Sequence, residues 1–95
     1  MKLYEFYCDC GRMGHLEGLF VASQEEVNNA IGNTIYFGEV LGKHSDIDVD
    51  LEEKHLKVLS EDRDKIEWLV EIMGDTSISG FNPIEMWQEQ SEDEE

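Results

Sequence analysis

Three aspartates at alternate positions, Asp46, Asp48 and Asp50, have the spacing in this chain that most resembles a site for chemistry. A calcium-binding loop opens in the same way, with ligands at its positions 1, 3 and 5. That motif also needs glycine at position 6 and glutamate at position 12, where this chain has Leu51 and Lys57. We therefore interpret the aspartates as the polar face of a β-strand whose alternate residues are aliphatic.

A second candidate set, Cys8, Cys10 and His15, contains the soft ligands that zinc prefers. Their spacing does not match the common zinc-binding motifs. Both sulfurs of a C-x-C strand lie on one face, and here that face is aromatic, so the cysteines also fit as small buried apolar residues. We predict no bound metal and no cofactor, and two cysteines do not indicate a disulfide scaffold.

Catalytic motifs are missing from the sequence. There is no G-x-S-x-G, no phosphate-binding loop and no H-E-x-x-H. Glu39 and His44 flank a turn and could form an acid and base pair, but such pairs arise by chance in a chain this acidic. We predict a protein that is not an enzyme and has no catalytic residues.

Net charge restricts the partners. Twenty-three Asp and Glu against seven Lys and Arg give a formal charge of −16 in 95 residues, which opposes binding to any polyanion. The first twenty residues carry charge and glycine throughout, unlike a secretory signal or a membrane span. We therefore expect a cytoplasmic protein that binds neither nucleic acid directly nor a membrane.

The elements that would position these residues are those of a small α+β domain over residues 1–90, followed by an acidic disordered tail over 91–95. The predicted order is ββαβββα, with a closing helical turn as an optional addition. Ser23 and Glu26 fit a capping box, and Ser60 is the predicted cap of the longest helix, whose apolar stripe faces inward. We expect one antiparallel sheet of four to five strands with two helices on one face. The predicted strands are 3–10, 19–22, 35–41, 46–51 and 55–60; residues 74–83 are expected to be a polar connection and a turn.

Two stretches, GEVLGKHSDI at 38–47 and ISGFNP at 78–83, give the chain a resemblance to small uncharacterised accessory proteins encoded by bacteriophages. The resemblance transfers no activity and no functional residue. It implies an accessory role in the cytoplasm of the host cell, exercised by binding a host factor.

The preferred hypothesis is an inhibitor of the anti-defence type that mimics DNA and blocks a basic, nucleic-acid-binding surface of a host protein. Alternate carboxylates on a strand lie about 6.6 to 7 Å apart, a spacing comparable to that of phosphates along one strand of a duplex. The predicted partner-binding residues are Asp46, Asp48, Asp50, Glu52, Glu53, Asp64, Glu67 and Glu71.

Two alternatives remain open. The first is a homo-oligomer that sequesters a small anionic ligand such as a nucleotide, with Trp68, Tyr36 or Phe81 as a stacking surface. The second is a structural or assembly subunit whose charge keeps it soluble. The predicted ligand-binding residues of the first alternative are Arg12, Gly42, Lys43, His44, Ser45, Phe81 and Asn82.

Overall fold

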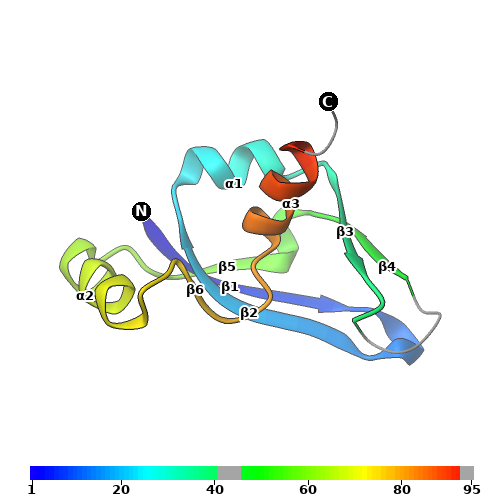
Figure 1. Cartoon of the computed structure of the whole chain (residues 1–95), viewed down its shortest axis with the longest axis horizontal. Coiled ribbons are helices and arrows are strands. Elements are labelled where there is room, and N and C mark those ends of the chain that lie inside the picture. Colours follow the sequence, from blue (N-terminus) through cyan, green and yellow to red (C-terminus); the bar gives the residue numbers. More distant parts are fainter. Residues whose placement is uncertain (41–45, 93–95) are drawn as a thin grey trace.

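The computed structural model describes residues 1–40 and 46–92 and shows an α+β fold (Figure 1). Two short 3-10 helices, η1 (Gly11–Met13) and η2 (Glu53–His55), connect longer elements. The strands are β1 (Lys2–Asp9), β2 (His15–Ala22), β3 (Thr34–Gly38), β4 (Ile47–Asp50), β5 (Leu56–Ser60) and β6 (Ser77–Gly80). The α-helices are α1 (Gln24–Ala30), α2 (Arg63–Met73) and α3 (Pro83–Glu92).

The strands form two antiparallel sheets, which corrects the prediction of a single one. Four strands pair in the order β5-β1-β2-β6, while β3 and β4 form a separate hairpin. The free edge of β2 is taken by β6, so β3 and β4 pair with each other and stand over one end of the main sheet (Figure 1). The β3–β4 register shifts between Tyr36 and Gly38, where Gly38 adopts a φ of +78°.

The core lies between one face of the main sheet and a cover made of α1, α3 and the β3–β4 hairpin (Figure 1). Aromatic contacts join these layers. Phe6 of β1 stacks on Phe37 of β3, with ring centroids 5.9 Å apart. Phe37 also meets the edge of Phe81 at 5.8 Å. Within the main sheet, Tyr4 stacks on Phe20 at 5.4 Å, so aromatic contacts occur both within the sheet and between the layers.

The start of α1 confirms the predicted capping box. The Ser23 hydroxyl accepts from the Glu26 N–H at 3.1 Å, and the Glu26 carboxylate accepts from the Ser23 N–H at 3.1 Å. The same carboxylate accepts from the Gln88 amide of α3 at 2.8 Å. These bonds lower the pKa of Glu26 and tie α1 to α3.

Residues 77–80, predicted as part of a polar connection, form β6. This strand can lie against β2 because Gly18 has no side chain: an ideal Cβ there would be 1.9 Å from the Phe81 carbonyl oxygen. Gly80 adopts a φ of +65°, and Phe81 then donates its N–H to the Glu17 carbonyl at 3.0 Å. The pairing of β6 with β2 therefore depends on close backbone contacts. The composition of Ser-Ile-Ser-Gly does not predict these contacts.

Helix α2 lies at the end of the main sheet opposite the β3–β4 hairpin (Figure 1). Its N-cap is Asp62, whose carboxylate accepts from the Lys65 N–H, and not Ser60 as predicted; the Ser60 hydroxyl instead accepts from the Asp62 N–H. The apolar stripe predicted to face inward consists of Ile66, Leu69, Val70 and Met73. Of these, Ile66 is buried, Leu69 and Val70 are half-buried, and Met73 is exposed. Of the two helices predicted to lie on one face of the sheet, α1 lies there, whereas α2 packs at the end of the sheet (Figure 1).

The final helix crosses the predicted end of the domain at residue 90. Helix α3 continues through Glu92, two residues past the expected end of the domain, and the rest of the predicted tail lies outside the described residues. Across the part of the chain that is described, no helix has the length and apolar character needed to cross a membrane.

Candidate functional site

The β3–β4 hairpin has one buried face and one acidic face. Ile47, Val49 and the following Leu51 are buried, whereas Asp46, Asp48 and Asp50 are exposed. This confirms the alternation predicted for the segment. The three carboxylates therefore project from one extended segment, two residues apart.

Residues of β3 complete the acidic face. Asp48 lies opposite Tyr36 in the antiparallel register, and Asp50 lies opposite Thr34, whose hydroxyl donates to its carboxylate at 2.6 Å. Within residues 1–40 and 46–92, none of the three aspartates forms a salt bridge. We refer to Thr34, Tyr36, Asp46, Asp48 and Asp50 as the acidic face.

Tyr36 is the aromatic residue of the acidic face and is 52% exposed. Hydrogen bonding to the Asp46 carboxylate raises the pKa of the Tyr36 phenol, and the nearby charges of Asp46, Glu39 and Asp48 act in the same direction. The phenol thus remains neutral as a hydrogen-bond donor over the physiological pH range.

We expect Asp46→Asn to lower the pKa of Tyr36 towards its ordinary value. The amide removes both a charged acceptor for the phenol and a negative charge that opposes phenolate formation. Titration of the Tyr36 ring by NMR measures the shift, and Glu25→Gln on α1, which removes one charge elsewhere, is the control. An unchanged Tyr36 titration in Asp46→Asn would show that the two side chains do not interact.

A side chain from α3 covers the outer edge of β3. The Gln90 amide oxygen accepts from the Tyr36 N–H at 2.8 Å, and the amide nitrogen donates to the Thr34 carbonyl at 3.0 Å. These two hydrogen bonds imitate those that a neighbouring strand would form. It holds the hairpin against α3 from the side opposite to β4.

Along the other edge of β4 there is a hollow of about 350 Å³ between this strand and the end of β1. Asp9 and His55 line it as well, and neither is among the predicted site residues, because only the fold brings residues so far apart in the chain together. The remaining lining residues are Cys8, Cys10, Asp46, Ile47, Asp48, Val49, Asp50 and Glu52. Carboxylates therefore surround a hollow large enough to admit a long cationic side chain.

His55 adds no positive charge to this hollow at neutral pH. Burial lowers its pKa, a change that the nearby Glu52 carboxylate opposes, and its Nδ1 accepts from the Glu52 N–H at 3.1 Å. Glu52 itself is 3.3 Å from the Lys54 ammonium, so its charge is partly compensated. Glu53 is exposed in η2.

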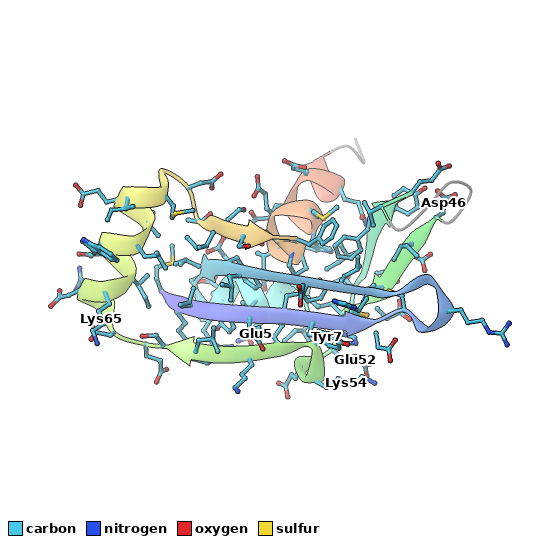
Figure 2. All side chains as sticks on the ribbon, turned by 90° about the horizontal axis from the view of Figure 1, so that it is seen from below. Glu5, Tyr7, Asp46, Glu52, Lys54 and Lys65 are labelled. Carbon is cyan, nitrogen blue, oxygen red and sulfur yellow. The ribbon has the colours of Figure 1, made fainter. Side chains whose placement is uncertain are left out.

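The predicted partner-binding residues do not form one surface. Asp64, Glu67 and Glu71 lie on α2, at the opposite end of a molecule 42 Å long. Figure 2 shows this separation through Lys65 of α2 and Asp46 beside β4. The separation arises because α2 follows β5 past the far end of the main sheet.

The residues predicted to hold an anionic ligand are also dispersed. Arg12 is exposed in η1, whereas Phe81 packs against Phe37 in the core. Asn82 is buried and caps α3, since its side-chain oxygen accepts from the N–H groups of Ile84 and Glu85. Trp68 and Tyr36 lie at opposite ends of the molecule, and Gly42, Lys43, His44 and Ser45 lie outside the described residues.

The residues considered as metal ligands, Cys8, Cys10 and His15, do not all lie on one side of the sheet. Cys8 is buried towards the core, and burial, together with the neighbouring Cys10, raises the pKa of its thiol to about 11. His15 is exposed and stacks on Tyr7, whose side chain alternates to the opposite face from Cys8. Cys8 and His15 therefore face opposite sides of the sheet, and over residues 1–40 and 46–92 no group of three potential ligands is arranged around a metal position.

Comparisons of the chain with protein-family models, with curated proteins and with solved structures give no match.

Proposed function

We propose that the protein acts by binding, through its acidic face, a basic nucleic-acid-binding surface of a partner protein, which it blocks. The observation that supports this proposal is the row of three exposed carboxylates on β4 and the residue before it, none of them in a salt bridge among the described residues. A charged surface of one sign steers an oppositely charged partner and increases the association rate.

The carboxylates project from a supported scaffold. Hydrogen bonds from Gln90 hold one side of the hairpin, and the buried faces of β3 and β4 pack on the core. A preorganised surface loses less conformational entropy on binding than a mobile acidic tail would. The fold thus supports a role for these residues beyond solubility.

Two features beside the aspartates suit a protein interface. Tyr36 offers an exposed aromatic ring with a hydroxyl group, the kind of residue that often dominates binding energy. The adjoining hollow is lined by carboxylates that can accept the two parallel hydrogen bonds of an arginine side chain. We therefore expect arginines of the partner to contact the hollow and Tyr36 to lie at the centre of the interface.

The proposal is tested by affinity capture from a nuclease-treated extract of the cells in which the protein naturally occurs. We expect immobilised wild-type protein to retain a basic protein that a DNA or RNA duplex displaces. Raising the ionic strength from about 0.1 M to 1 M, which shortens the screening length from about 10 Å to 3 Å, should release it.

Two triple variants distinguish the acidic face from net charge. Asp46→Asn/Asp48→Asn/Asp50→Asn removes three charges from the acidic face, and Asp64→Asn/Glu67→Gln/Glu71→Gln removes three from α2. We expect the first to weaken binding of the captured protein by about 10- to 100-fold, the equivalent of about 1.4 to 2.7 kcal/mol, and the second to have little effect. Equal losses in both variants, or retention that salt does not change, would contradict the proposal.

A further inference from the structure

Helix α2 has large apolar side chains that no other part of the described fold covers. Trp68 is 61% exposed and Ile72 is 59% exposed, and they lie one turn apart on the same side of the helix. Met73 is also 48% exposed, while Ile66 on the opposite side is buried against the sheet. Contiguous exposed apolar residues of this size are typical of an interaction surface.

The surface beside Trp68 is concave. A hollow of about 390 Å³ lies between α2 and the sheet, lined by Leu3, Ser60, Lys65, Ile66, Trp68 and Leu69. Protruding apolar side chains and an apolar hollow thus adjoin each other on one surface. Such a surface can be complementary in shape to its own copy related by a two-fold axis, because each copy supplies both parts.

The charges around this surface also favour a second copy. Arg63 and Lys65 lie among acidic residues at the start of α2, so this surface carries both signs of charge in a chain of charge −16. On α2, Arg63 lies 3.2 Å from Glu67, and Lys65 lies 3.9 Å from Asp62. A surface bordered by both signs can approach its own copy, whereas the acidic face would repel its own copy.

We propose that the protein forms a two-fold symmetric dimer through α2, with the helices antiparallel and Trp68 of each copy packed against Ile72 of the other. This pairing leaves both acidic faces exposed at the outer ends, since α2 and the β3–β4 hairpin lie at opposite ends of each copy (Figure 1). Antiparallel packing also places the start of one α2, with Arg63 and Lys65, beside the acidic Glu71 and Asp75 at the end of the other.

Sedimentation velocity of the full chain over a range of concentrations and sodium chloride tests the proposal. We expect dimer formation to strengthen with salt, because screening reduces repulsion between two copies of charge −16. This dependence is opposite to that expected for binding a basic partner, so the two proposals can fail independently. The dimer of Asp46→Asn/Asp48→Asn/Asp50→Asn should be at least as stable as that of the wild type.

Substitution of the exposed aromatic residue is the decisive variant. Trp68→Ser should weaken dimerisation by at least about thirty-fold, the effect of losing one interface hot spot. Tyr7→Ser, which removes another half-exposed aromatic residue on the outer face of the main sheet, should leave the dimer unchanged. Ile72→Ser should reproduce the loss, and circular dichroism should show the native fold for all three.

A single-tryptophan variant gives an independent readout. In Trp87→Phe the fluorescence arises from Trp68 alone, and we expect its emission to shift to the blue as protein concentration rises. A chain that stays monomeric at high salt and high concentration would overturn the proposal. So would a dimer that Trp68→Ser leaves intact, or a Trp68 emission that shifts only when cell extract is added.

Discussion

Gly18→Ala is expected to destabilise the protein by about 3 kcal/mol or more, the upper part of the range for overpacking a close contact. The new Cβ would lie 1.9 Å from the Phe81 carbonyl oxygen and 2.6 Å from the Phe81 nitrogen. Both atoms belong to the backbone, so β6 and the start of α3 must move away from β2. The move also weakens the hydrogen bond from Phe81 N–H to the Glu17 carbonyl.

Urea denaturation followed by circular dichroism measures this effect. Glu17→Ala, at the adjacent position on the outer face of β2, is the matched control and should change the free energy of unfolding by no more than about 0.5 kcal/mol. Its side chain is exposed, and so is the side chain of His15, with which it pairs at 3.7 Å. A Gly18→Ala variant within about 1 kcal/mol of wild type would show that β6 does not approach β2 this closely.

Phe37→Ala is expected to cost about 3 to 5 kcal/mol, as large-to-small substitutions of buried aromatic residues do. Phe37 is buried and contacts Phe6 of the main sheet and Phe81 before α3. Its ring therefore links the hairpin that carries the acidic face to the main sheet and to the segment before α3. Without its ring, the hairpin loses its main aromatic contact with the main sheet.

Hydrogen exchange shows where the stability is lost. We expect amides of β3 and β4 to lose protection in Phe37→Ala more than those of β1 and β2, because the cavity opens beneath the hairpin. Tyr36→Ala, at the next position on the solvent-facing side, is the control and should cost about 1 kcal/mol or less. Similar free energies of unfolding for the two variants would contradict this assignment of inner and outer faces.

Local patterns predicted those parts of the fold that depend on neighbouring residues. The alternation of Asp48 and Asp50 with aliphatic residues identified the two faces of β4, and the Ser23 and Glu26 pair identified the start of α1. Both signals arise within one strand or one helical turn. The acidic face could therefore be predicted in outline from the sequence.

Contacts between distant segments could not be predicted in this way. Ser77–Gly80 has a polar, glycine-containing composition, and its strand depends on Gly18, some sixty residues earlier. Likewise, the approach of Asp9 to β4 depends on the path of the whole chain. Topology also explains why the acids of α2 lie far from Asp46 (Figure 2), although the sequence analysis grouped them, since the sequence gives the order of charges along the chain and only the fold gives their positions in space.

The side chain of Gln90 has a consequence for how the protein behaves at high concentration. An uncovered strand edge presents backbone donors and acceptors to which other chains can add, as in amyloid fibrils. Gln90 occupies the Tyr36 N–H and the Thr34 carbonyl on the outer edge of β3. One amide therefore helps to protect a short, aromatic strand from polymerising with strands of other molecules.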